Sequence, residues 1–239
     1  MSNVDLGDVT IHYEEVGKGP KALIFCKTHA LGNLEMYKGE PEHWQADFGR
    51  AMVWDYRGQG QSGRAAKYSL PLVASDLARM MDKLEIKSAV LYGFLWGGFL
   101  AQEFALDYPE KCAALILDSS ASECNVAASE RWYQGSEKAK TDPEVSAEDR
   151  EFLVFANRTV AGLREHPFTP RLKDVKAPAL IIGGGKDPMG GAPAAVIMSR
   201  QIPGSKLNII QEGGHGLIRE RPQEVHDIVV QFCREHGVL

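Results

Sequence analysis

The sequence predicts an α/β fold with a mostly parallel central sheet and helices on both of its faces. Two patterns in the 239 residues lead to this prediction. Short, continuous apolar runs recur along the chain, and such runs are typical of strands that are buried on both faces of a sheet. Segments with apolar residues at helical spacing separate these runs, and strands that alternate with helices build parallel sheets.

Seven strands are expected. The first alternates between apolar and polar residues and ends at the turn Gly17-Lys18-Gly19-Pro20, whereas the later ones are short apolar runs. In chain order, the expected strands span residues 9–16, 22–26, 51–54, 88–92, 113–117, 179–182 and 206–210.

Helices are predicted between and after these strands. Apolar residues recur at helical spacing over residues 72–84 and again over residues 99–108, where Pro109 ends the pattern. A last helix is predicted near the end of the chain, where Val225 and Phe232 belong to one apolar face.

One segment breaks the alternation of strands and helices. Residues 121–173 are polar and helix-prone, and they contain no run that is typical of a buried strand. We therefore predict a core formed by residues 1–120 and 174–239, with residues 121–173 inserted as a short helical lid over one end of the sheet.

Composition and charge argue against several classes of protein. The formal net charge is −5 and there is no basic run, which argues against a nucleic-acid partner. No apolar run approaches the ~20 residues that cross a bilayer, and the first residues lack the features of a signal peptide. Cys26, Cys112, Cys124 and Cys233 form no metal-type spacing. We expect a cytoplasmic protein with reduced thiols and without a metal or cofactor, and the oligomeric state stays open.

A glycine-flanked turn follows the strand predicted at residues 88–92. It reads Gly93-Phe94-Leu95-Trp96-Gly97 and leads directly into a predicted helix, which is the context of the nucleophile elbow, G-x-S-x-G. Glycines are needed there because the middle residue has a strained backbone and neighbouring chain packs against the turn. Leu95 occupies the middle position, where the pattern has serine.

Three further motifs follow predicted strands. The segment Asp55-Tyr56-Arg57-Gly58-Gln59-Gly60-Gln61-Ser62 predicts a tight structural loop, in which Asp55 and Arg57 can satisfy backbone groups and each other. Asp187 closes a G-x-x-D segment and can accept an imidazole N–H, with Asp118 as the alternative acid. His215 lies between Gly214 and Gly216, which allow the ring to project into a site.

In this order, the four motifs resemble those of the α/β-hydrolase superfamily. The resemblance covers about residues 9–232 and is weakest over residues 121–173. It implies that Leu95 occupies the nucleophile position, that Asp187 is the triad acid and that His215 is the triad base. The details look most like enol-lactone hydrolases and related small carboxylesterases.

The resemblance also implies an oxyanion hole and a substrate pocket. The loop after residue 27 corresponds to the H-G-x-G loop of the superfamily, and Leu31 is the expected donor within it. Trp96, directly after the nucleophile position, would supply the second backbone N–H. The expected substrate-binding residues are His29, Ala30, Phe94 and Trp132. Other apolar residues of the insertion are expected either to face the pocket or to brace the lid: Tyr133, Phe152, Phe155 and Leu163.

Leu95 removes ordinary serine catalysis. An isobutyl group has no lone pair and cannot form an acyl intermediate. Cys26 and Lys27 are candidates for a substitute nucleophile, although each is more simply explained as a residue at the end of a strand. The phenols of Tyr56 and Tyr92 are weaker candidates.

Three hypotheses of different classes remain. In the first, the chain is related to ester or lactone hydrolases, and its serine was replaced by natural divergence or by engineering. Alternatively, it is an enzyme that uses the pair of His215 and Asp187 as a general base on a small carbonyl substrate, in a lyase-like or oxygenase-like reaction. The third hypothesis is a non-catalytic protein that binds a small apolar carbonyl-containing molecule. Activity after Leu95→Ser and the effect of His215→Ala discriminate among them.

Overall fold

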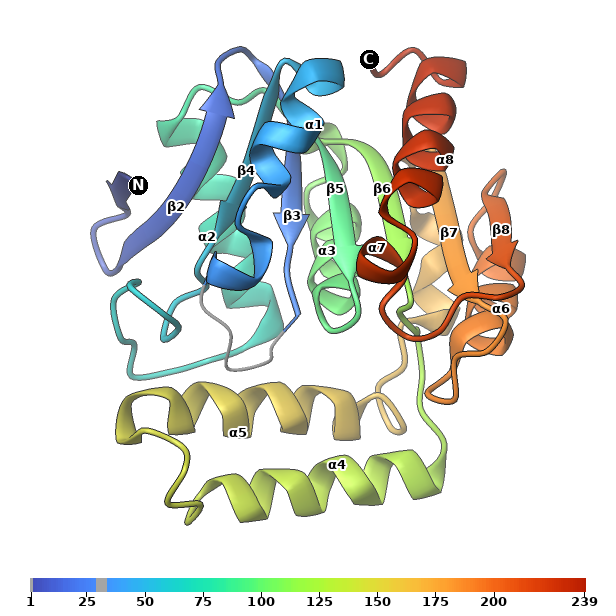
Figure 1. The fold of residues 1–239 in the computed structure, drawn as a ribbon. Helices are drawn as coiled ribbons and strands as arrows, with labels where there is room; N and C mark the ends of the chain where they lie inside the picture. The colour runs from blue at the N-terminus through green and yellow to red at the C-terminus, as the bar shows by residue number, and fades with distance from the viewer. Residues whose placement is uncertain (1, 29–33) are drawn as a thin grey trace.

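The computed structural model describes residues 2–28 and 34–239, and Figure 1 shows a central sheet between layers of helices. The sheet has eight strands in the order β1-β2-β4-β3-β5-β6-β7-β8. The strands span Ser2–Asp5 (β1), Thr10–Gly17 (β2), Lys21–Cys26 (β3), Arg50–Trp54 (β4), Ser88–Phe94 (β5), Cys112–Asp118 (β6), Ala179–Gly184 (β7) and Lys206–Ile210 (β8).

The sheet is parallel from β4 to β8 and antiparallel only at one edge, where β2 pairs with β1 and with β4. The predicted α/β fold with a mostly parallel sheet is thus confirmed. All seven expected strands are present, and their bounds differ from the predicted ones by at most two residues. β1 was not expected, because its four residues SNVD carry one buried side chain at the edge of the sheet and give no strand pattern.

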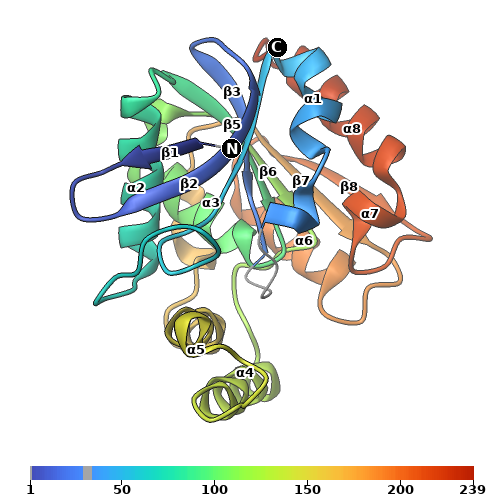
Figure 2. The same ribbon diagram turned by 60° about the vertical axis from the view of Figure 1, so that its left-hand side comes forward.

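Helices cover both faces of the sheet. Helices α1 and α8 lie on one face, whereas α2, α3 and α6 lie on the other (Figure 2). Three of them, α2, α3 and α8, are the predicted helices, while α1 and α6 lack a clear apolar stripe in the sequence. The helices of the two layers span Glu40–Phe48 (α1), Leu70–Lys83 (α2), Gly97–Asp107 (α3), Gly191–Gln201 (α6), Leu217–Glu220 (α7) and Pro222–Glu235 (α8).

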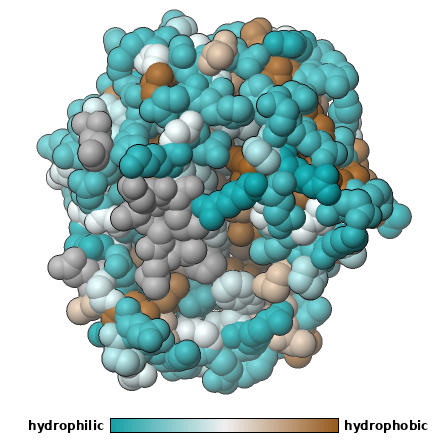
Figure 3. Space-filling model, viewed as in Figure 1, coloured by the Kyte–Doolittle hydropathy of each residue, from teal (hydrophilic) through white to brown (hydrophobic). Residues whose placement is uncertain are grey.

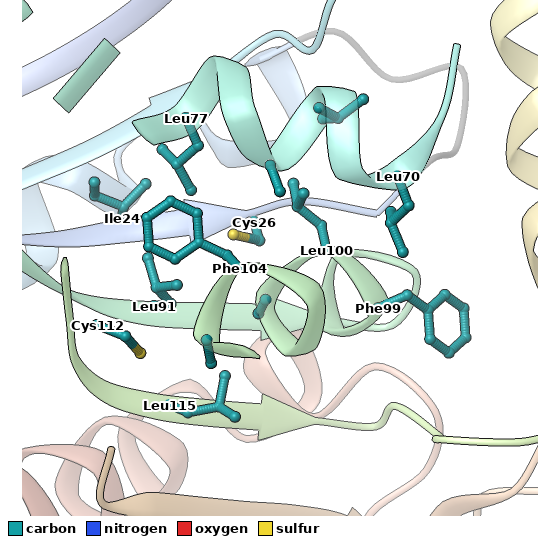
Figure 4. Packing of buried hydrophobic residues seen from close by; sticks show 14 of the residues in the cluster. Ile24, Cys26, Leu70, Leu77, Leu91, Phe99, Leu100, Phe104, Cys112 and Leu115 are labelled. Atoms are coloured by element: carbon teal, nitrogen blue, oxygen red, sulfur yellow. The ribbon is translucent and has the colours of Figure 1, made fainter. Parts of the chain in front are cut away.

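The largest buried cluster lies between the sheet and helices α2 and α3. Figure 4 shows Leu100 and Phe104 of α3 packed between Leu77 of α2 and the strand residues Ile24 and Leu91. A second cluster lies on the opposite face, under α1 and α8. Burial of the first cluster holds α3, and therefore the turn that precedes it, in a fixed place on the sheet.

Residues 121–173 form a pair of helices at the carboxyl ends of the parallel strands. Helices α4 (Val126–Ala139) and α5 (Ala147–Gly162) lie side by side below the sheet in Figures 1 and 2. Short 3₁₀ segments occur at Leu34–Tyr37 (η1), Pro109–Lys111 (η2) and Thr169–Asp174 (η3). Residues 121–173 contain no strand, as their sequence predicts.

The face of the molecule in Figure 3 is largely hydrophilic, with scattered apolar residues. Over residues 2–28 and 34–239, no helix combines the length and the apolar character that crossing a bilayer requires. The same residues contain no group of three or more His, Cys, Asp or Glu side chains placed to hold a metal ion.

Candidate active site

The turn between β5 and α3 has the backbone of a nucleophile elbow. Leu95 has φ of 52°, in the left-handed region that side-chain-bearing residues rarely adopt. A Cβ on Gly97 would collide with the carbonyl oxygen of Cys26, and one on Gly93 would come within 2.7 Å of the Gly98 Cα. The two glycines are therefore required because backbone packs directly against the turn.

Hydrogen bonds fix Leu95 at the junction of strand and helix. Its N–H donates to the carbonyl oxygen of Asp118 at 3.0 Å, and its own carbonyl accepts from the N–H of Gly98 at 3.0 Å. The first bond ties the turn to the neighbouring strand β6, and the second begins helix α3. The elbow geometry thus persists although the side chain at its tip is apolar.

Asp187 and His215 come together from the loops after β7 and β8. The Asp187 Oδ2 lies 3.0 Å from the His215 Nδ1, and the Asp187 side chain has no exposed surface. Asp187 also accepts hydrogen bonds from the backbone N–H groups of Met189 at 2.7 Å and Gly191 at 3.1 Å. Burial on its own raises the pKa of Asp187, but these three hydrogen bonds outweigh it and hold that pKa below its ordinary value.

The orientation of the His215 ring follows from this pairing. An ionised carboxylate can only accept, so Asp187 selects the tautomer with the proton on Nδ1. The Nε2 atom is then the ring nitrogen that can take up a proton. The His215 side chain is 39% exposed and lines a cavity, so this nitrogen is within reach of a small molecule.

A cavity of about 350 Å³ lies between the carboxyl ends of the strands and the pair α4 and α5. Leu95 and His215 both line it, and Trp132 and Leu163 of residues 121–173 line its other side. Most of its lining is apolar. The polar side chains on the described wall are those of Thr28, Ser119, Ser120, Glu123, Asn125, Arg131 and His215.

Asp118 is a buried carboxyl group next to this cavity. Its Oδ2 accepts from the Tyr92 hydroxyl at 2.6 Å, and its Oδ1 accepts from the Ser119 hydroxyl at 2.8 Å. Burial raises the pKa of Asp118 to about 6, against the lowering effect of these hydrogen bonds and of His215. Asp118 is not hydrogen-bonded to His215 in the structure; the histidine is bonded to Asp187 instead.

The expected substrate-binding and oxyanion residues have different placements. Trp132 lines the cavity, whereas Phe94 packs into the buried cluster under α1 and α8 and is not part of the described lining. Phe94 ends β5, where alternation turns its side chain to the other face of the sheet. Trp96 lines the cavity and donates from its indole to the carbonyl oxygen of Ala156 at 3.1 Å. The remaining expected residues lie outside the described residues: His29, Ala30 and Leu31.

The other apolar residues of the insertion were expected either to face the pocket or to brace the lid. Leu163 lines the cavity. Phe152 and Phe155 brace α5, with ring centroids 6.0 Å and 5.9 Å from the indole of Trp96. Tyr133 is exposed and carries the guanidinium of Arg158 over its ring.

The candidate substitute nucleophiles do not reach the cavity. Cys26 is fully buried, and burial raises the pKa of its thiol. Lys27 is also buried, and burial lowers its pKa although Asp55 lies 3.2 Å away. Burial likewise raises the pKa of the phenols of Tyr56 and Tyr92. None of these four residues lines the described part of the cavity.

The Asp55–Ser62 loop is structural, but its ion pairs differ from those expected. Asp55 accepts from the N–H of Gln61 at 3.0 Å and pairs with Lys27 rather than with Arg57. Arg57 reaches α2 instead, where both of its bonds to Asp76 are 2.5 Å long. The partners in these two ion pairs lie 28 and 19 positions apart in the sequence, so local spacing could not reveal them.

Sequence reasoning missed Ser119 and Ser120. Both line the cavity at the carboxyl end of β6, and the Ser120 hydroxyl is buried without a hydrogen-bond partner. The available signal was a run of three polar residues, Asp118-Ser119-Ser120, directly after an apolar strand. Sites in parallel sheets gather at such strand ends.

Comparison with known proteins agrees with the fold. Residues 31–139 match the sequence family described as alpha/beta hydrolase fold. A poly(3-hydroxyalkanoate) depolymerase of Ectopseudomonas oleovorans is 26% identical over 203 residues, covering 74% of this chain and 71% of that protein. The 3-oxoadipate enol-lactonase 2 of Acinetobacter baylyi is 24% identical over 251 residues, covering 93% and 92% respectively.

Among solved structures, the enol-lactonase from Burkholderia xenovorans LB400 superposes with a TM-score of 0.81. It is 19% identical and the match covers 98% of this chain and 100% of that one, so it supports the fold. The family match and the shared fold support a relation to the α/β-hydrolase superfamily. Within the superfamily it loosely resembles enol-lactone hydrolases and esterases.

Proposed function

We propose that the protein is an enzyme in which His215, oriented by Asp187, acts as a general base on a small carbonyl compound. The observation that carries the proposal is the pairing of His215 with Asp187 at 3.0 Å on the wall of an open cavity of about 350 Å³. A pocket without function would have no need to keep a buried carboxylate aligned with an imidazole. Perturbed, paired groups in a cleft are typical of catalytic sites.

The chemistry follows from what the site retains. The His215 Nε2 removes a proton from water or from an acidic C–H or O–H of the bound compound, and Asp187 stabilises the imidazolium that forms. Leu95 supplies an apolar wall in place of a nucleophile. This mode of action fits lyase-like or oxygenase-like chemistry, or the direct attack of water on a carbonyl group.

The lining defines the class of substrate. Leu95, Trp96 and Phe99 form an apolar wall, and His215 and Ser119 add polar groups on the side of the strand ends. A small, largely apolar molecule with one carbonyl group matches this distribution. We further propose that residues 121–173 act as the lid of the site and that the protein works in the cytoplasm.

The test is turnover across a panel of short-chain esters, enol-lactones and β-dicarbonyl compounds. His215→Ala should reduce turnover by roughly 10²–10⁴-fold, the usual contribution of a positioned base. Leu95→Ala should change turnover only modestly, because Leu95 shapes the pocket without reacting. His166→Ala, at an exposed residue outside the cavity, is the matched control. Turnover that survives His215→Ala unchanged would exclude the proposal.

A second candidate function is ligand binding without turnover, and Leu95 itself favours it. An apolar residue at the tip of the elbow converts the reacting position into part of a mainly apolar cavity. Calorimetric titration with the same compounds, followed by product analysis after long incubation, separates the two functions. Tight binding with unchanged ligand would support the binding protein.

A further inference from the structure

Ser119 directly follows strand β6, as Leu95 directly follows the neighbouring strand β5. Strands β5 and β6 are in parallel register, with Gly93 opposite Leu117 and Phe94 opposite Asp118. The pairing ends there, and Leu95 and Ser119 are the first residues after the two strands. A hydroxyl group is thus present one strand away from the position where the superfamily has its serine.

Ser119 also shares the unusual backbone of Leu95. Its φ is 53°, beside 52° for Leu95, and the only other described non-glycine residue with positive φ is Glu85. Glu85 lies in the turn after α2, whereas Leu95 and Ser119 both line the cavity. Such strain costs on the order of 1–3 kcal/mol per residue and concentrates at functional sites.

The hydroxyl of Ser119 is held by a buried carboxylate. It donates to the Asp118 Oδ1 at 2.8 Å, and the Tyr92 hydroxyl occupies the other oxygen at 2.6 Å. Asp118 has no exposed surface, so its carboxylate is shielded from bulk water. A hydroxyl that donates to a carboxylate directs its lone pairs elsewhere, and Ser119 lines the cavity.

The other described hydroxyl groups that line the cavity, those of Ser120 and Thr28, are not described as donating to a carboxylate. The Ser120 hydroxyl is buried without a hydrogen-bond partner, so it has no base. Thr28 follows β3, and the bond described for it is its backbone N–H donating to the Tyr37 hydroxyl at 2.9 Å. Ser119 is the lining hydroxyl that the structure joins to a carboxylate.

We propose that Ser119 is the nucleophile of this cavity and that Asp118 is the acceptor of its proton. In the first step the Ser119 Oγ bonds to the carbonyl carbon of an ester, the hydroxyl proton passes to Asp118, and the alcohol leaves after taking up that proton. In the second step water, deprotonated by His215, attacks the acyl group, and the proton on His215 passes to the Ser119 Oγ as the acid is released. This second step rests on the proposed function of His215, whereas the first does not.

The experiment is acylation by p-nitrophenyl acetate, followed by intact mass measurement and peptide mapping after an acid quench. The wild-type protein should gain one acetyl group on Ser119 together with a stoichiometric initial burst of nitrophenol. Ser119→Ala should abolish both, and Ser119→Cys should restore them on the new thiol. Asp118→Asn should slow acylation by roughly 10²-fold. Ser199→Ala, on α6 and outside the cavity lining, should react like the wild type.

Near-ultraviolet circular dichroism on each variant checks that it is folded. The proposal is overturned if the wild type gains no acetyl group, if the group maps to another residue, or if folded Ser119→Ala reacts like the wild type. Failure of the proposed role of His215 has a different signature. If His215 is the base, His215→Ala retains the acetyl group on Ser119 for much longer; if it is not, the group is lost at the wild-type rate.

Discussion

The elbow and the pair of Asp187 and His215 are two parts of the candidate site that are held in place in different ways. At the elbow, between β5 and α3, Leu95 has φ of 52° and an apolar side chain. After β7 and β8, the side chains of Asp187 and His215 are paired at 3.0 Å. The difference shows that the elbow backbone is maintained by packing, since Cys26 and Asp118 contact it through backbone atoms. The acid–base pair depends instead on side-chain hydrogen bonds, which packing alone does not maintain.

The largest expected effect comes from returning a serine to the elbow. Leu95→Ser places a hydroxyl on a turn that already has φ of 52°, in the cavity that His215 lines. We expect hydrolysis of short-chain chromogenic esters to rise by at least ~10²-fold, because a triad member typically contributes far more than that. Leu95→Ala, measured in the same assay, should show no rise. An unchanged rate for Leu95→Ser would mean that the oxyanion donors no longer fit a tetrahedral intermediate.

A second variant tests whether backbone packing maintains the elbow. Gly97→Ala would bring a Cβ against the carbonyl oxygen of Cys26, so β3 and α3 would have to separate. We expect the free energy of unfolding to fall by about 3 kcal/mol or more, measured by urea denaturation. Gly162→Ala is the matched control, since nothing lies within 4 Å of a Cβ there. An equal, small effect at both positions would contradict the packing explanation.

A third prediction concerns the pH dependence of stability near the elbow. The pKa of Asp118 rises from 3.8 to about 6 on folding, so the folded protein binds more protons than the unfolded chain between these pH values. Its contribution to stability is therefore greatest below about pH 4 and is lost as the pH rises to about 6. The loss amounts to roughly 3 kcal/mol at about 1.4 kcal/mol per pH unit.

Asp118→Asn removes this dependence without changing the shape of the side chain. The difference in unfolding free energy between variant and wild type should grow in favour of the variant from pH 4 to pH 7, as measured by urea titrations. Asp187 acts in the opposite direction, because its lowered pKa makes stability fall as the medium becomes acidic. Taking the difference between the two proteins cancels the Asp187 contribution. A difference in unfolding free energy that stays constant from pH 4 to pH 7 would contradict a raised pKa for Asp118.

The smallest expected effect concerns the link between the elbow and α5. Trp96 donates from its indole to the carbonyl oxygen of Ala156, so Trp96→Phe loses this hydrogen bond between the elbow and α5. We expect a loss of about 1–2 kcal/mol in unfolding free energy, measured by thermal denaturation. Faster hydrogen exchange should appear in α5 but not in α8, which lies on the other side of the sheet. Equal exchange in both helices would show that Trp96 does not hold α5.

Sequence patterns predicted the buried part of the fold well. Five continuous apolar runs identified strands β3 to β7, because a strand buried on both faces carries few polar residues. The run at residues 206–210 also identified β8, although this edge strand is largely exposed. β1 and the shorter helices were not predicted, because a short edge strand and helices with a weak apolar stripe give little periodic signal. The strand and helix context of the elbow also followed from local sequence.

The partners of buried charged groups could not be predicted in the same way. Arg57 was expected beside Asp55, yet it pairs with Asp76 on α2, and Asp55 pairs with Lys27. Tyr92 and Asp118 are 26 residues apart and meet only because β5 and β6 are neighbours in the sheet. Motif order did anticipate that Asp187 and His215 would lie together, whereas the place of Ser119 on the cavity wall required the order of the strands in the sheet.

The loops that carry Asp187 and His215 are joined to each other by their backbones. The N–H of Gly185 donates to the carbonyl oxygen of Ile210 at 2.9 Å, and the N–H of Lys186 donates to that of Gly213 at 2.9 Å. The spacing between the acid and the base is therefore set by the backbone of two loops as well as by the 3.0 Å contact of their side chains.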